Sequence, residues 1–124
     1  MAGTYTKEKL SGSTDGLLIP VAGTARNAGT TVHQAGDGSD AGAKDEIWLY
    51  ATNKNRASIN LTIEWGNENA ETAEITQSIP ANNGLTLIIP GLILTNSEVV
   101  KAYVGDSVEF ANKVLLAGFV NRVT

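Results

Sequence analysis

The stretch "DEIWLYATNKNRASINLTIEWG", residues 45–66, decides the fold class. Its two halves, residues 46–52 and 59–65, are rich in the β-branched and aromatic side chains that favour strands. The residues between them, "NKNRAS", are typical of a turn. The pattern therefore predicts two antiparallel strands joined as a hairpin, with a loop of about four or five residues.

The length of this loop decides which side chains face the core, because a slip of one residue turns every side chain over. With the shorter loop, Trp48 and Tyr50 enter the core. With the longer loop, which we favour, Trp48 and Tyr50 lie on the opposite face. The side chains inside are then Ile47, Leu49, Leu61, Ile63 and Trp65.

Either loop leaves apolar side chains on the second face of the strands. Three kinds of partner would bury these side chains. A second layer of the same domain buries such a face in many packed proteins. A neighbouring subunit or a host protein is another cover, because Trp and Tyr are enriched at interface centres. A sugar stacked on the aromatic rings is the third.

The rest of the chain predicts an all-β domain. Short segments rich in Val, Ile, Leu and Thr alternate with turn residues, and no stretch keeps a helical period. This spacing favours an antiparallel β-sandwich or barrel of about seven to nine short strands. The further candidate strands are residues 16–23, 30–35, 74–79, 84–90, 92–95, 98–105 and 114–123.

The beginning of the chain has a different composition. Residues 1–16 are rich in Gly, Ser, Thr and Lys and contain a single leucine, Leu10. Such a segment is usually mobile or becomes ordered on a partner. We therefore expect a flexible, extended N-terminal arm over residues 1–16 and a single β domain over residues 17–124.

Composition excludes several classes of protein. The 124 residues suit one domain, and the absence of cysteine excludes disulfides and thiolate metal sites. The net charge of -4, with Lys and Arg scattered singly, argues against nucleic-acid binding. No apolar run approaches the ~20 residues of a membrane helix, and the polar N-terminus lacks a secretory signal. We expect a soluble protein made in the cytoplasm that binds no membrane.

Candidate catalytic and metal-binding residues are few. His33 is the only histidine and has no recognisable catalytic motif around it. The loop at residues 36–44 contains Asp37 and Asp40 but lacks two of the oxygen ligands that a calcium loop requires. Glu46 and Glu64 form a conceivable pair of catalytic carboxylates on adjacent strands, although outward charges are the favoured interpretation. We therefore expect that the protein is not an enzyme and binds no cofactor. We also expect no catalytic, cofactor-binding or metal-binding residues.

A series of segments resembles small structural proteins of tailed bacteriophages, the head decoration or capsid cement proteins. The segments, which span nearly the whole chain, are "LSGSTDG" (10–16), "TTVHQAG" (30–36), "DEIWLYATN" (45–53), "LTIEWG" (61–66), "IPANNGLTLIIPGLIL" (79–94) and "GFVNRVT" (118–124). The resemblance implies a β module that binds the outer surface of an assembled capsid and stabilises it. It also implies the major capsid protein as partner, and a location on the capsid surface of the virion after synthesis in the host cytoplasm. Such proteins commonly self-associate as homotrimers or bind at junctions between capsomers, and the resemblance does not fix the oligomer.

On this resemblance we expect the N-terminal arm and one sheet face to contact the capsid or a second subunit. The residues concerned are Leu10, Ser11, Ser13, Asp15, Leu17, Leu18, Trp48 and Tyr50. Two alternatives remain. One is a neck or tail component of the phage. The other is a carbohydrate-binding module with Trp48, Tyr50, Trp65 and Tyr103 as its stacking platform.

Overall fold

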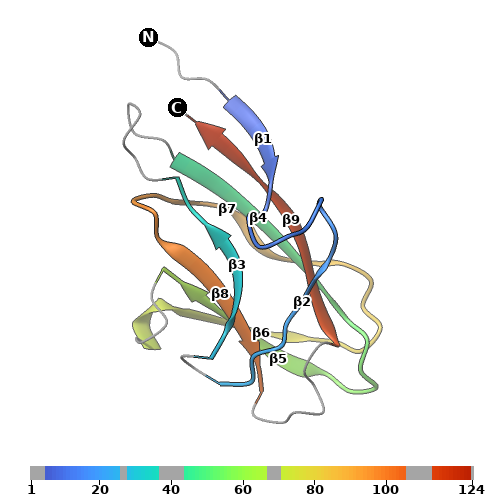
Figure 1. The fold of residues 1–124 in the computed structure, drawn as a ribbon. Helices are drawn as coiled ribbons and strands as arrows, with labels where there is room; N and C mark the ends of the chain where they lie inside the picture. The colour runs from blue at the N-terminus through green and yellow to red at the C-terminus, as the bar shows by residue number, and fades with distance from the viewer. Residues whose placement is uncertain (1–4, 26–27, 37–43, 67–70, 106–112, 124) are drawn as a thin grey trace.

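The computed structural model describes residues 5–25, 28–36, 44–66, 71–105 and 113–123. These residues form nine strands in two antiparallel sheets and one short 3₁₀ helix, Glu71–Ala73 (Figure 1). Sheet A contains β1 (Tyr5–Lys9), β2 (Ile19–Pro20), β4 (Lys44–Asn53), β7 (Thr86–Leu94) and β9 (Val114–Val123). Sheet B contains β3 (Thr30–Gln34), β5 (Ile59–Trp65), β6 (Glu74–Ile79) and β8 (Val99–Val104). The sequence-based prediction of an all-β sandwich is confirmed.

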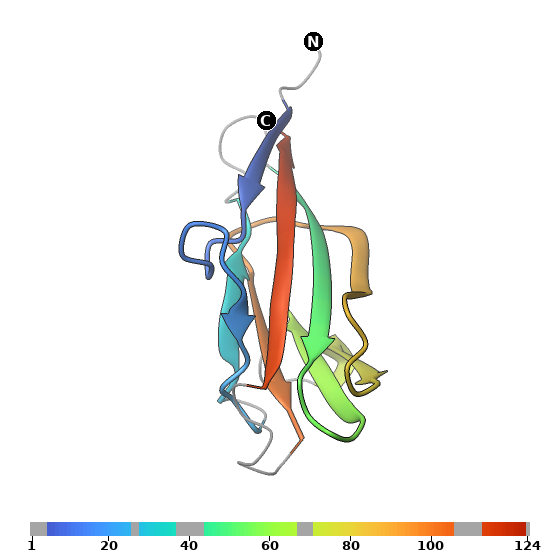
Figure 2. The same ribbon diagram turned by 90° about the vertical axis from the view of Figure 1, so that its right-hand side faces the viewer.

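The order of strands places β4 and β9 at the centre of sheet A. The order is β1-β9-β4-β7, and β2 also pairs with β9 beyond the end of β1. Sheet B has the order β3-β8-β5-β6. Figure 2, turned by a quarter, shows β9 in red beside β4 in green. Because both are long central strands, their side chains decide what each face of sheet A presents.

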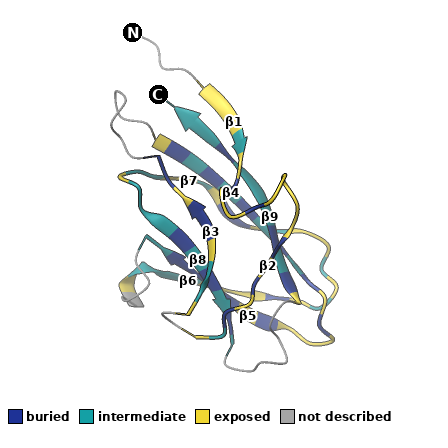
Figure 3. Ribbon diagram, in the orientation of Figure 1, coloured by how far each residue is buried: buried dark blue, intermediate teal, exposed yellow. Residues whose placement is uncertain are grey.

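The core lies between the two sheets and is aliphatic. Buried side chains alternate along β4 and β8, so that each of these strands turns one face inward (Figure 3). Each buried Leu, Ile or Val stabilises the fold by about 1.5–3 kcal/mol relative to an exposed one. The inward-facing set predicted with the longer loop is confirmed. Ile47, Leu49, Leu61 and Ile63 are fully buried, and Trp65 packs partly buried against them.

The predicted hairpin between residues 46–52 and 59–65 is wrong. Strand β4 pairs with β9 on one side and with β7 on the other, so it has no free edge for β5. Strand β5 lies in the other sheet, between β8 and β6. The two strands nevertheless bury the side chains that a hairpin would have buried, because both face the same core from opposite sides. Alternation in the sequence identified the inner face but not the strand partners.

Asn53 fixes the crossing of the chain from sheet A to sheet B. This side chain is buried, and its amide group donates to the carbonyls of Ala57 (3.0 Å) and Ile79 (2.9 Å). Its Oδ1 accepts a hydrogen bond from the backbone N–H of Asn55 (2.8 Å). A buried amide with these three bonds holds a tight turn and ties the end of β4 to sheet B.

Residues 5–13 are not arranged as a free arm. Strand β1 pairs with β9 from Tyr5 opposite Val123 to Lys9 opposite Phe119. Leu10 is 1% exposed and belongs to the hydrophobic core. The polar composition that suggested an arm reflects an edge strand with one solvent-facing side. Residues 1–4, the first part of the expected arm, lie outside the described residues.

Candidate functional site

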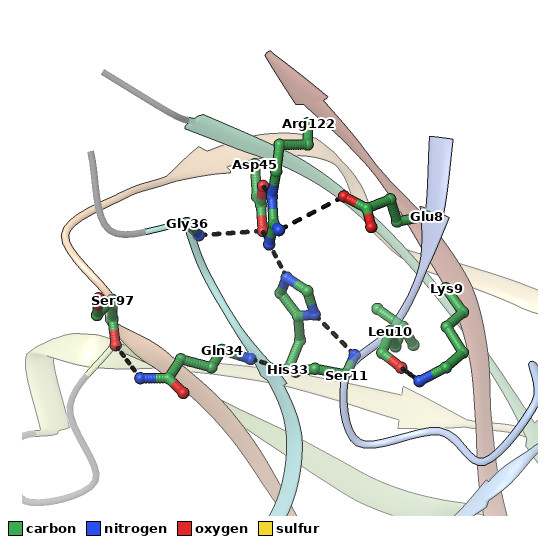
Figure 4. A network of polar contacts seen from close by, with 10 residues as sticks. All are labelled: Glu8, Lys9, Leu10, Ser11, His33, Gln34, Gly36, Asp45, Ser97 and Arg122. Carbon is green, nitrogen blue, oxygen red and sulfur yellow. Dashed lines mark hydrogen bonds and ion pairs between the residues drawn. The ribbon is translucent and has the colours of Figure 1, made fainter. Parts of the chain in front are cut away.

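A buried polar network joins both sheets near the start of β4, and His33 on β3 lies at its centre (Figure 4). Its Nδ1 accepts a hydrogen bond from the backbone N–H of Ser11 (2.9 Å), and its Nε2 lies 2.6 Å from Oδ2 of Asp45. Because a backbone N–H can only donate, Nδ1 carries no proton in this arrangement. His33 is therefore neutral, with its proton on Nε2 directed at Asp45.

Asp45 is completely buried and accepts hydrogen bonds at both carboxylate oxygens. Arg122 donates from Nε to Oδ1 (2.8 Å) and from Nη2 to Oδ2 (2.9 Å). The backbone N–H of Gly36 donates to Oδ2 as well (3.2 Å). Burial raises the pKa of the Asp45 carboxyl, but the hydrogen bonds from Arg122 and His33 and the charge of Arg122 outweigh it and hold this pKa below its ordinary value.

Arg122 extends the network to the N-terminal strand. Its Nη1 lies 3.4 Å from Oε2 of Glu8 on β1, in a contact that is partly exposed. The network thus connects β1, β3, β4 and β9, which belong to both sheets. Sequence reading treated His33 as isolated. Side-chain alternation along the strands does place the two partners on the inward face, because Asp45 shares that face with Ile47 and Arg122 shares it with Val120.

The hydrogen bonds that this network already makes limit the reactions it can support. Ser11, His33 and Asp45 are the residue types of a hydrolytic triad, but the Ser11 group that meets the imidazole is the backbone N–H. The Ser11 hydroxyl instead accepts a hydrogen bond from the backbone N–H of Gln34 (2.7 Å). His33 is 1% exposed and has both nitrogens bonded. In this conformation the network positions backbone segments and offers no nitrogen to a substrate.

The outer face of sheet A is the second candidate site, and we call it the aromatic face. It comprises Trp48 and Tyr50 on β4, Phe119 on β9, and Leu87, Pro90 and Ile93 on β7, which register and alternation place on one side of the sheet. Leu87 is 42% exposed and Ile93 is 60% exposed, while both Trp48 and Tyr50 are half-buried. Exposed apolar side chains gathered on one face are typical of interaction surfaces.

Trp48 lies at the centre of the aromatic face and is fixed by its neighbours. Its ring stacks with Phe119 at 6.2 Å between centroids and 11° between planes. Its Nε1–H donates to Oε1 of Glu46 (2.7 Å), which also accepts from Nδ2 of Asn121 (3.1 Å). The Nζ of Lys7 sits 4.7 Å from the Phe119 centroid. The bonds from Trp48 and Asn121 hold the pKa of Glu46 below its ordinary value.

Gly91 makes room for the indole of Trp48. The register of β7 against β4 shifts between Ile47 and Trp48, and Gly91 occupies the extra position with φ of +81°. A Cβ on Gly91 would lie 2.7 Å from Cζ2 of Trp48. Glycine is therefore required here both by the backbone conformation and by the contact with the ring. Pro90, on the same edge strand, has no N–H to offer to another strand.

The expected interface residues separate into three groups. Trp48 and Tyr50 lie on the aromatic face as expected for an outward-facing pair. Leu10 and Ser13 are buried within the domain, so these two positions form no free contact surface, whereas Ser11 is exposed and is bonded to His33 and Gln34. The remaining three, which are exposed on the segment before β2, are Asp15, Leu17 and Leu18.

Three other expectations are contradicted by the placement of the strands. Glu46 and Glu64 do not form a carboxylate pair, because β4 and β5 lie in different sheets. The favoured interpretation of outward charges is wrong for Glu64, which is 1% exposed. The four-residue stacking platform is also wrong. Trp65 packs against the core, and Tyr103 lies on sheet B, where its hydroxyl donates to Oε2 of Glu74 (2.8 Å).

The described residues contain no group of three or more His, Cys, Asp or Glu side chains that could hold a metal ion. The calcium-loop residues Asp37 and Asp40 lie outside the described part of the chain. Within the same described ranges, no helix is long and apolar enough to span a membrane. Comparison with models of protein families, with curated proteins and with solved structures gives no match to this chain.

Proposed function

We propose that this protein is a non-enzymatic structural component of a bacteriophage virion, which binds the outer surface of the capsid and stabilises it. The sequence resemblance to head decoration proteins supplies the class of partner, the major capsid protein. The observation that supports this proposal most directly is the aromatic face, with Leu87 and Ile93 exposed beside the stacked Trp48 and Phe119. Burying such side chains is favourable for a partner that covers them.

The charge of the protein suits this partner. The net charge of -4 favours a capsid surface that presents Lys and Arg, and the attraction would steer association most strongly at low salt. Self-association as a homotrimer would further strengthen attachment, because linked sites raise avidity by roughly 10²–10⁴. The protein would then be made in the host cytoplasm and reside on the capsid surface.

Copy number in purified virions tests this proposal and separates it from a neck or tail role. Quantitative mass spectrometry against the major capsid protein should give hundreds of copies per particle for a decoration protein. A value of about a dozen or fewer indicates a symmetric ring at the neck or tail instead. Absence of the protein from purified particles would contradict any virion role.

A carbohydrate-binding function is the second candidate, and one specific observation favours it. The stacked Trp48 and Phe119 rings are bordered by the carboxylate of Glu46 and the amide of Asn121, a combination that suits a sugar ring and its hydroxyls. Titration with cello-, malto- and chito-oligosaccharides should then change the Trp fluorescence, and a Trp48→Ala variant should lose the change. An unchanged fluorescence with all three probes would contradict this function.

A further inference from the structure

The N-terminal segment, residues 5–13, is attached to the sandwich by few contacts. Among the described strands, β1 pairs only with β9, and most of its residues are exposed (Figure 3). Besides this pairing with β9, its links to the rest of the domain include the buried Leu10, the partly exposed ion pair of Glu8 with Arg122, the contact of Lys7 with the Phe119 ring, and the backbone around Ser11. Segments with few buried contacts open at a smaller free-energy cost than the whole domain.

The attachment around Ser11 depends on β3. The N–H of Ser11 donates to Nδ1 of His33, and its hydroxyl accepts from the N–H of Gln34. The next N–H, that of Gly12, donates to the carbonyl of Val32 (2.8 Å). A Cβ on Gly12 would lie 2.5 Å from the carbonyl oxygen of Thr31, so the two backbones are in close contact. Of these contacts, only the one with His33 depends on a group that titrates.

This contact requires a neutral imidazole. Nδ1 accepts the Ser11 N–H only while it carries no proton, because protonation would place two N–H groups head to head. The other side of the ring tolerates the added charge, since Nε2 already donates to the carboxylate of Asp45. A proton added to His33 therefore preserves the Asp45 contact and removes the Ser11 contact.

Charged side chains from three strands lie around His33. Asp45 from β4 contacts the ring directly, Arg122 from β9 is bonded to Asp45, and Glu8 from β1 pairs with Arg122. The segment itself contributes Lys9, whose Nζ donates to the carbonyl of Ser13 (2.8 Å).

We propose that His33 is a proton-operated latch: the neutral ring holds the N-terminal segment against the sandwich, and the protonated ring releases it. Histidine is the side chain that ordinarily changes charge between about pH 5 and 8, so mild acidification is the trigger. Release uncovers the edge of β9 from Phe119 to Val123, whose backbone groups then become free to pair with another strand. Protonation of His33 thus releases β1 and exposes the edge of β9.

Amide hydrogen exchange, measured by NMR and corrected for the intrinsic pH dependence of exchange, tests the latch in the intact protein. Between about pH 7.5 and pH 5, protection of residues 5–13 should fall at least about tenfold, while β4, β5 and β8 stay protected. The imidazole nitrogen shifts should report a proton on Nε2 alone at the higher pH and on both nitrogens at the lower. Unchanged relative protection of residues 5–13 after both nitrogens are protonated would overturn the proposal.

Two variants separate His33 from the other titrating groups. In His33→Gln the side chain at this position stays uncharged, so protection of residues 5–13 should be the same at both pH values. In Glu8→Gln the histidine remains, so the loss of protection at low pH should persist. A pH-dependent release that survives in His33→Gln, or that disappears in Glu8→Gln, would assign the effect to another group and overturn the latch.

Discussion

Asp45 and Arg122 form a two-pronged pair across the centre of sheet A, with Nε to Oδ1 at 2.8 Å and Nη2 to Oδ2 at 2.9 Å. They stand directly opposite each other in the register of β4 and β9. The carboxylate is fully buried, whereas the guanidinium side chain is 32% exposed. Because two parallel bonds fix both side chains, the pair orients Asp45 toward His33 and connects the sheets.

Replacing Asp45 should destabilise the fold strongly. In Asp45→Asn, Arg122 loses its charged partner, and the Nε2–H of His33 faces a neutral amide. Removing one member of a buried pair should lower the free energy of unfolding by about 3 kcal/mol, as measured by urea denaturation at neutral pH. As the control, Glu8→Gln removes the 3.4 Å partly exposed partner of the same arginine and should cost less than about 1 kcal/mol. Equal losses in the two variants would contradict this account of the network.

The same carboxylate predicts how stability falls in acid. The pKa of Asp45 is lower in the folded protein than its ordinary value of 3.8. Its contribution is therefore fully present above the unfolded pKa and is lost as the pH falls through the lower folded pKa. Urea midpoints should decline between about pH 5 and pH 2 in the wild type, and part of this decline should be missing in Asp45→Asn. Identical acid profiles for the two proteins would show that Asp45 does not contribute to the loss of stability in acid.

Gly91→Ala should disturb Trp48 as well as the backbone. The residue has φ of +81°, and its added Cβ would press on the indole, so we expect a loss of about 2–3 kcal/mol and a shift in Trp fluorescence. Gly84→Ala is the matched control. Gly84 has φ of +71° but nothing within 4 Å of a Cβ, so only the backbone cost of about 1 kcal/mol applies. A Gly91→Ala protein no less stable than Gly84→Ala would argue against the contact.

Leu10 should behave as a core residue. Leu10→Ala leaves a cavity beneath the N-terminal segment and should cost about 2–4 kcal/mol in thermal or urea unfolding. Leu17→Ala is a suitable control, because Leu17 is 65% exposed and its loss should change stability by less than about 0.5 kcal/mol. Deleting residues 1–13 should likewise lower Tm. An unchanged Tm after this deletion would contradict this role and support the free arm expected from composition.

The sequence predicted the inward and outward faces better than the strand partners. Alternation placed Leu49 inside and Trp48 outside, because the side-chain period of a strand is a local property. It paired β4 with β5 incorrectly, since two strands that face one core from opposite sheets have the same pattern as a hairpin. The role of Leu10 was missed because one apolar residue in a polar segment carries no periodic signal. The bond from Ser11 to His33 depends on pairing between distant segments, which no local pattern encodes.

The most direct test of the proposed function is the binding of the purified protein to capsids that lack it, measured by co-sedimentation. A Leu87→Glu, Ile93→Glu variant introduces charge on the aromatic face at positions that are exposed and therefore tolerant. Thr76→Glu places one such charge on an exposed position of sheet B and is the control. We predict that the wild type and Thr76→Glu sediment with capsids and that the aromatic-face variant does not. Binding of the aromatic-face variant at the wild-type level would contradict the account.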